Sequence, residues 1–170
     1  SLDKNNLTIN WFKNLNKSLD LNFSNLFFSN SVILHNQRII ISTDPYLYVL
    51  RESNGSTLIK KPITSIFNPI ISGDYIFLIT KDNLLACINL KSGQIIYSLN
   101  IDQQIADFLN TKKRSVNIKS FSIVNNSLYI FLTNSYLLKF SKEGKIKVIN
   151  KLNNKINSIP IFVDDSILYL

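Results

Sequence analysis

The sequence predicts an all-β protein made of repeated four-stranded antiparallel sheets. The first observation behind this prediction is a pattern, Thr-x-x-[Tyr/Asn]-Leu, that occurs three times with an apolar run on each side. The second is a glycine turn that follows each copy after 11 to 13 residues. The copies begin at Thr43, Thr80 and Thr133, and their glycines are Gly55, Gly93 and Gly144. Landmarks that recur in a fixed order indicate an internal repeat.

Turn residues divide each repeat into four short apolar runs rich in Ile, Leu, Tyr and Phe, which are typical of strands. In the clearest copy the runs cover residues 69–72, 75–80, 84–89 and 94–99. The joints between them contain Gly, Asn, Asp and Ser, the residues of hairpin turns. Four short antiparallel strands in a repeat of about 40 residues describe one blade of a β-propeller.

This register predicts a single partial propeller over residues 1–170, equivalent to about four blades. The blade boundaries fall near residues 1–25, 26–65, 66–118, 119–157 and 158–170. Residues 7–12 are expected to form the last strand of a preceding blade, with Trp11 in the position that Tyr97 has later. Residues 160–170 are expected to form the first strand and a half of another blade. We therefore expect a fragment of a larger ring, closed by further sequence or by a second chain.

The interval between the second and third repeats is longer than the first, 53 residues against 37, which indicates an insertion at residues 102–118. Asp102 is suited to cap a short helix there. The apolar residues of this helix recur at i, i+3 and i+4, as on one side of an amphipathic helix; they are Ile105, Phe108 and Leu109. Such a helix is expected either to cover the ring or to dock a partner.

The composition limits the class of protein. With 170 residues and 45% hydrophobic content, the chain can bury one core of ordinary size, which excludes a disordered tail. No apolar stretch is long enough to span a bilayer, and no signal peptide is recognisable in the sequence. The single cysteine, Cys87, excludes an internal disulfide and a cysteine-based zinc site.

The stretch from Pro69 to Tyr97 resembles the repeat of the PQQ-like β-propeller family. The resemblance rests on the turn Gly73-Asp74, the strand 84–89 (Leu-Leu-Ala-Cys-Ile-Asn) and the turn Ser92-Gly93, and three copies extend it over nearly the whole chain. It implies a propeller fold more specifically than a function, because the family includes quinoprotein dehydrogenases and the non-catalytic outer-membrane assembly lipoproteins called BamB.

The enzyme branch of the family would imply PQQ and a bound calcium ion, held by converging Asp, Glu and Asn oxygens. The acidic residues of this chain lie at turns and form no spaced ligand cluster. The terminal Trp of the family repeat is replaced by Tyr97 and occurs only at Trp11. We therefore expect no catalytic, cofactor-binding or metal-binding residues, and a PQQ-dependent dehydrogenase, or a degenerate fragment of one, is the alternative.

The BamB branch gains support from residues 11–22, which resemble the BamB segment whose Leu-x-Leu-Arg loop contacts the barrel-assembly protein BamA. Leu19 and Leu21 match the two leucines, whereas Asn22 replaces the arginine. The resemblance implies a BamA-like protein partner without the electrostatic part of that contact. In the alternative interpretation, the two leucines only pack beneath the next blade.

The formal net charge of +8 suggests an acidic partner. Strand alternation predicts that the loops after the second and fourth strands of each blade share one face, and these loops carry a net charge of +6 against zero on the opposite face. Exposed basic residues expected on this face are Lys60, Lys61, Lys112, Lys113 and Arg114. Nucleic acid is the alternative client, but the aromatic residues are expected within strands rather than among the basic ones.

These observations predict a non-catalytic propeller scaffold for protein–protein interaction, with a BamB-like role in the assembly of outer-membrane β-barrel proteins. The candidate partner-binding residues are Leu19, Leu21, Asn22, Lys60, Lys61, Phe108, Leu109, Lys112, Lys113 and Arg114. The resemblance implies a periplasmic or outer-membrane-anchored protein. A homodimer that completes the ring is a further expectation.

Overall fold

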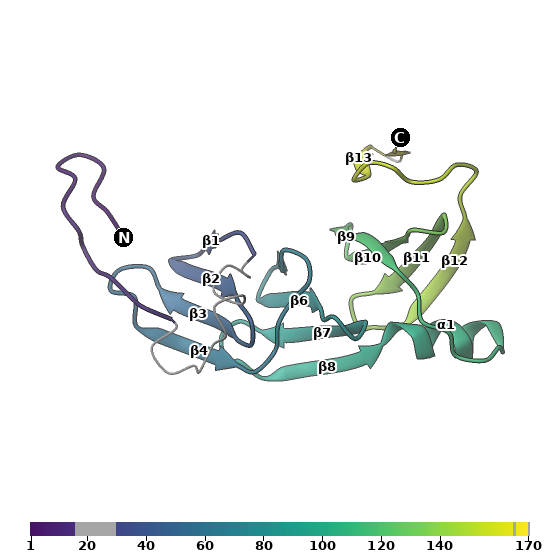
Figure 1. Ribbon diagram of the computed structural model, residues 1–170, viewed down its shortest axis with the longest axis horizontal. Coiled ribbons are helices and arrows are strands. Elements are labelled where there is room, and N and C mark those ends of the chain that lie inside the picture. The colour runs from purple at the N-terminus through teal and green to yellow at the C-terminus, as the bar shows by residue number, and fades with distance from the viewer. Residues whose placement is uncertain (16–29, 165, 170) are drawn as a thin grey trace. The chain divides into compact units, whose positions relative to one another are not determined.

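The computed structural model describes residues 1–15, 30–164 and 166–169, and it has an all-β architecture with one helix (Figure 1). The described residues form three four-stranded antiparallel sheets and one two-stranded sheet, in which consecutive strands are neighbours. The predicted four-stranded blades are therefore confirmed. The chain divides into two compact units, Ser1–Asn68 and Pro69–Leu170, and each is described by itself. The predicted blade boundaries and the single partial ring stay predictions.

The first unit contains one sheet, with the strand order β1-β2-β3-β4. Its strands are β1 (Ile33–His35), β2 (Arg38–Ser42), β3 (Leu47–Arg51) and β4 (Thr57–Lys61). The central strand β3 is almost wholly buried, because apolar side chains point to both faces: Leu47 and Val49 are fully inaccessible, and Tyr48 and Leu50 nearly so. This pattern is typical of a strand that is covered on both sides.

The predicted strand at residues 7–12 is wrong. Leu7 has a backbone φ of 59°, in the left-handed region, and the described N-terminal residues form a single bridge between Leu2 and Ile9. A strand needs a continuous partner for its backbone groups, and this segment instead bonds to itself through a turn in which Leu7 N donates to Asp3 O at 2.8 Å. Trp11 nevertheless packs on the turn of the β3–β4 hairpin.

The second unit begins with the sheet β5-β6-β7-β8, which corresponds to the clearest repeat of the sequence. Its strands are β5 (Ile70–Ser72), β6 (Tyr75–Ile79), β7 (Leu84–Asn89) and β8 (Ile95–Asn100). These bounds agree with the predicted runs to within one residue. The middle strands form the core of the sheet, since Ile76, Leu78, Leu85 and Ile88 are fully buried.

The next sheet of this unit has the order β12-β11-β10-β9. Its strands are β9 (Ile118–Val124), β10 (Ser127–Leu132), β11 (Tyr136–Ser141) and β12 (Ile146–Lys151), and the hairpin β13 (Ile161–Val163) and β14 (Ser166–Leu168) follows. β5 contacts β9, so the first strands of the two four-stranded sheets are neighbours. Phe162 of β13 packs on Phe131 of β10, with ring centroids 6.1 Å apart, and a small core forms between this hairpin and its preceding sheet.

An aromatic side chain packs over a hairpin glycine in both units. Trp11 Nε1 donates a hydrogen bond to Glu52 O at 2.8 Å, and its ring lies against Gly55. Tyr97 of β8 donates to Lys142 O at 2.8 Å, and its ring lies against Gly144 in the next sheet. The two residues therefore make equivalent contacts, as the repeat register predicts. A Cβ atom at Gly55 would overlap the Trp11 ring, and one at Gly144 would overlap Leu99 and press on the Tyr97 ring.

Candidate partner-binding groove

The insertion between β8 and β9 contains the helix α1 (Ile101–Leu109), which directly follows β8 and contacts both β8 and β12 (Figure 1). The predicted cap was wrong by two residues: Asn100, not Asp102, caps the helix. Asn100 has extended backbone angles, and its side chain accepts a hydrogen bond from Gln103 N at 2.9 Å. The helix begins earlier than predicted because β8 runs straight into it, so the residue with extended backbone that a cap requires is the last one of the strand.

Asp102 instead holds the insertion to the body of the second unit. Its Oδ1 accepts hydrogen bonds from Asn83 Nδ2 at 2.9 Å and from Val116 N at 3.1 Å. Asn83 Nδ2 also donates to Val116 O at 2.8 Å. Asn83 and Asp102 are both buried, with 8% and 7% of their surface exposed. Buried polar groups with all their partners in place give a rigid structure. This network, the Asn83–Asp102–Val116 clasp, fixes the start of α1 and the end of the loop that follows it.

The end of α1 is fixed in a similar way. Asn110 adopts left-handed angles and its N–H donates to Ala106 O and Asp107 O, while Thr111 N donates to Ala106 O at 2.9 Å. A left-handed residue after the last turn is a common helix stop. The basic run 112–114 therefore follows the C-terminus of the helix as a separate loop.

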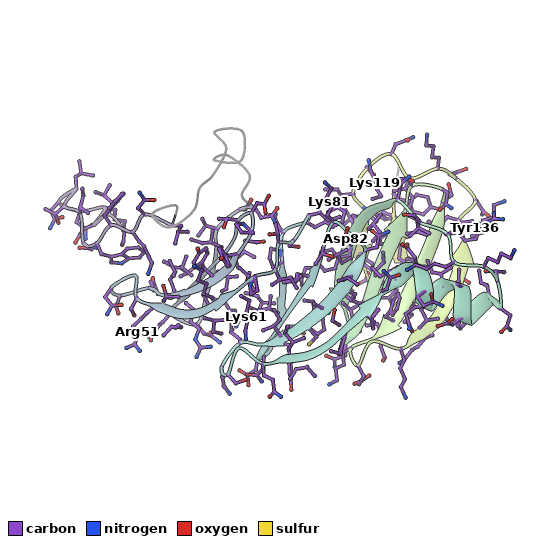
Figure 2. All side chains as sticks on the ribbon, turned by 60° about the horizontal axis from the view of Figure 1, so that its bottom comes forward. Arg51, Lys61, Lys81, Asp82, Lys119 and Tyr136 are labelled. Carbon is purple, nitrogen blue, oxygen red and sulfur yellow. The ribbon has the colours of Figure 1, made fainter. Side chains whose placement is uncertain are left out.

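Between α1, this loop and the start of β11 lies a groove of about 680 Å³, called here the α1 groove. Its lining residues are Asp102, Ile105, Ala106, Leu109, Thr111, Lys112, Arg114, Ser115, Val116, Asn117, Leu132, Thr133, Asn134, Tyr136, Leu138 and Ile149. Figure 2 labels Tyr136, which lines the groove from the start of β11, and Lys119, the second residue of β9. The volume is in the range of ordinary ligand sites.

The floor of the α1 groove is apolar. Leu132 and Leu138 are buried beneath it, and Ile105 and Leu109 come from the same side of α1, four residues apart. Leu109 remains 48% exposed, and so its side chain is available to an occupant. Phe108 is exposed to the same degree, 47%, but it does not line the groove. Of the three residues predicted on one side of the helix, Ile105 and Leu109 line the groove and Phe108 does not.

The border of the α1 groove is basic. Lys112 and Arg114 line it, and Lys113 lies between them in the chain. Within the described parts of the chain, the ion pair present is Lys91–Asp74 at 2.7 Å, and none involves residues 112–114. The carboxylate of Asp102 is bound in the clasp, and that of Asp107 accepts from Gln103 Nε2 at 2.7 Å. Lys112 and Arg114 therefore form no ion pair with a described carboxylate, and the lining carries two cations against one carboxylate, Asp102, which is buried in the clasp.

The donor set of the α1 groove does not fit calcium. Ca²⁺ takes about six to eight oxygen ligands, several of them carboxylates. Asp102 is the one acidic residue lining the groove, and its Oδ1 already accepts two hydrogen bonds. No cluster of three or more His, Cys, Asp or Glu suited to a metal ion occurs among the residues that the structure describes.

The remaining predicted site residues lie elsewhere or outside the described part. Lys60 and Lys61 belong to the first unit, and the Lys60 ammonium lies 4.0 Å from the centroid of the Tyr46 ring and 5.7 Å from that of Tyr48. Figure 2 labels Lys61 and Arg51, which lie at opposite ends of that sheet because β3 and β4 are antiparallel. Leu19, Leu21 and Asn22 are outside the described residues.

Sequence reasoning missed several residues of the site. Tyr136 was visible only as a landmark of the repeat, and Asn83 occupies the equivalent position in the preceding repeat. Asn83 precedes the third strand of its sheet, β7, and Tyr136 is the first residue of the third strand of the next sheet, β11. Val116 carried no signal, because its part in the clasp is made by its backbone.

No helix of the described chain has the length and apolarity needed to cross a membrane. Neither a known protein family nor a curated protein matches the sequence. Among solved structures, the chain is similar to BamB from Moraxella catarrhalis, with 7% identity, a TM-score of 0.64, and coverage of 81% of this chain and 38% of that one.

Two further structures are similar. One is the computationally designed Ika8 protein, with 10% identity, a TM-score of 0.59, and coverage of 81% of this chain and 41% of that one. The other is the quinohemoprotein alcohol dehydrogenase ADHIIG from Pseudomonas putida HK5, with 17% identity, a TM-score of 0.53, and coverage of 69% and 19%. The chain spans less than half the length of each of the three. At these identities the likeness establishes a propeller-type fold and leaves function to the residues.

Proposed function

We propose that this chain is a non-catalytic propeller scaffold that binds a protein partner through the α1 groove. One observation carries the proposal: an apolar floor and a border with two cations, Lys112 and Arg114, are combined in a groove whose walls are held by the Asn83–Asp102–Val116 clasp. Rigid walls reduce the entropy that binding costs, and exposed apolar side chains beside charges are typical of interaction sites.

The partner we propose is a BamA-like barrel-assembly protein, which would give the chain a role in the assembly of outer-membrane β-barrel proteins. The similarity to BamB in fold and the resemblance of residues 11–22 to the BamB contact segment support this choice. A periplasmic or outer-membrane-anchored location belongs to the same proposal.

The test measures the affinity of the chain for the soluble periplasmic domains of a BamA-like protein from the same source, by biolayer interferometry. The groove variant is Lys112→Glu with Arg114→Glu. Its matched control is Lys145→Glu with Lys147→Glu, an equal charge change at the β11–β12 hairpin, at the other end of the sheet from the groove. We expect the groove variant to bind about tenfold more weakly and the control to change by less than about twofold. Equal effects in both variants, or none in the groove variant, would contradict the proposal.

A PQQ-dependent dehydrogenase is the second candidate, favoured by the similarity to a quinohemoprotein alcohol dehydrogenase. The test is a titration of the chain with PQQ in the presence of calcium and of a chelator. Saturable binding of PQQ that requires calcium would replace the scaffold proposal with that of an enzyme.

A homodimer that completes the ring requires two chains to associate. Light scattering after size exclusion on the same sample measures this association.

A further inference from the structure

We infer that the occupant of the α1 groove is an acidic peptide segment that inserts one large apolar side chain between α1 and β11. The inference rests on the proposed function and specifies the chemistry of the partner. Three observations support it. The charges favour an acidic segment, the exposed floor favours an apolar side chain, and the fixed walls favour binding without rearrangement.

The charges select an acidic segment. Lys112 and Arg114 both line the groove, and the carboxylates closest to them in the chain, Asp102 and Asp107, are already hydrogen-bonded to Asn83, Val116 and Gln103. Lys112 and Arg114 stand against one lining carboxylate, Asp102, which is buried in the clasp, so the charge that an occupant meets at the border is positive and attracts the opposite sign. A basic or neutral segment would leave both cations without a partner, and an arginine at such a site is suited to grip a carboxylate with two hydrogen bonds.

The floor selects an apolar side chain within that segment. Ile105 and Leu109 on the helix face the groove together with Tyr136, Leu138 and Ile149 from the sheet. Leu109 is half exposed, so covering it removes apolar surface from water. Interfaces of this kind obtain most of their affinity from a few apolar anchors at the centre, surrounded by polar contacts. A purely ionic ligand would leave this floor exposed.

The fixed walls indicate that the groove is preformed and does not close on its ligand. The loop after α1 is held at one end by Asn110 and Thr111, which bond back to the helix, and at the other by Val116 in the clasp. Thr133 N also donates to Asn117 O at 2.9 Å, which joins the loop to the β10–β11 turn. An occupant therefore meets a groove that needs no rearrangement, and the affinity should depend on side-chain chemistry.

The experiment uses fluorescein-labelled peptides and fluorescence anisotropy with the full chain. The main probe is a short peptide with glutamates flanking a central phenylalanine. One control probe replaces the glutamates with lysines, and the other replaces the phenylalanine with serine. We expect each control probe to bind at least about tenfold more weakly than the main probe. Raising the salt from 0.1 M to 1 M shortens the Debye length from about 10 Å to about 3 Å and should weaken the main probe.

Neighbouring residues of this chain supply the matched variants. Leu109→Ser should weaken the main probe, and Phe108→Ser should not, because the two side chains are equally exposed and only Leu109 lines the groove. Lys112→Glu with Arg114→Glu should weaken it more than Lys113→Glu, since Lys113 does not line the groove. Both Ser variants change half-exposed positions, and their circular dichroism spectra should match that of the wild type.

Several outcomes would overturn the inference. Equal binding of the acidic and basic probes, or equal effects of the Leu109 and Phe108 variants, would each do so. A labelled single-stranded oligothymidine that binds more tightly than the main probe and ignores Leu109→Ser would assign the basic border to nucleic acid instead. If the BamA-like domains depend on Lys112 and Arg114 while the probes ignore charge, the inference fails and the proposed function stands. If neither responds to the groove variants, both fail.

Discussion

The contact between Tyr97 and Gly144 can be tested by adding a single methyl group. Gly144 has a φ of 86°, and a Cβ atom built on it would lie 2.6 Å from Leu99 Cδ2 and 3.0 Å from Tyr97 Cε2. Gly73 also has a positive φ, 58°, but its Cβ would meet no atom within 4 Å. The two glycines belong to the same unit, so Gly73→Ala is the matched control for Gly144→Ala.

The two substitutions share a backbone term and differ in a packing term. A left-handed conformation costs an alanine about 1–2 kcal/mol relative to glycine. At Gly73 this is the whole expected cost. At Gly144 the Tyr97 ring cannot simply move away, because its hydroxyl is held by Lys142 O at 2.8 Å. Overpacking at such a place adds about 1–3 kcal/mol. We therefore expect Gly144→Ala to lower the free energy of unfolding by about 1–3 kcal/mol more than Gly73→Ala does.

The assay is urea unfolding followed by circular dichroism, with thermal unfolding as a second measurement. For a chain of this size, each kcal/mol corresponds to a change of about 2–4 °C in the melting temperature. Free energies of unfolding for the two variants that agree within about 0.5 kcal/mol would refute the idea that Leu99 and Tyr97 pack tightly against Gly144. Gly55→Ala repeats the experiment in the first unit, where the fluorescence of Trp11 reports on the same kind of contact.

The other predictions concern the clasp, the helix cap and the buried thiol. Asp102→Ala removes a buried acceptor from Asn83 Nδ2 and Val116 N and should lower the free energy of unfolding by about 2–3 kcal/mol. Asp102→Asn keeps an oxygen at the position of Oδ1 and should lower it by less. Urea unfolding measures the two losses, and equal losses would contradict the role of this oxygen. Asn100→Ala should cost about 1 kcal/mol and increase hydrogen exchange in α1, and unchanged exchange rates would count against the cap. Burial raises the pKa of the Cys87 thiol from 9.0 to about 11 and also raises the pKa of Tyr97. The protonated thiol is therefore retained in the folded state, and its contribution to stability is complete below about pH 9 and is lost as the pH rises through about 11. The urea midpoint of the wild type should fall over that range, and that of Cys87→Ala should fall less; parallel curves would argue against a buried thiol.

The sequence by itself determined the repeat, the number of strands in each complete repeat and the position of the strands. These features are local: a strand follows from a short apolar run, and its ends follow from turn residues such as Gly73 and Gly93. The same register placed Trp11 and Tyr97 in equivalent positions, and the structure gives both the same contacts with a glycine and a hairpin carbonyl.

The sequence could not exclude the strand at residues 7–12, because its pattern is apolar enough for a strand and what it lacks is a partner. It also predicted Asp102 as the cap of α1, and only the backbone angles where β8 ends show that Asn100 is the cap. Asp102 accepts hydrogen bonds from residues 19 and 14 positions away in the chain, and no local sequence pattern predicts such bonds.

The α1 groove likewise required the tertiary structure. The sequence identified Leu109, Lys112 and Arg114 as candidates, but it grouped them with Phe108 and Lys113, which do not line the groove. Tyr136 and Ile149 reach the same site from strands that follow far along the chain. Which side chains share a groove depends on how an insertion packs on a sheet, and that packing is set by contacts between distant residues, which a single sequence does not reveal.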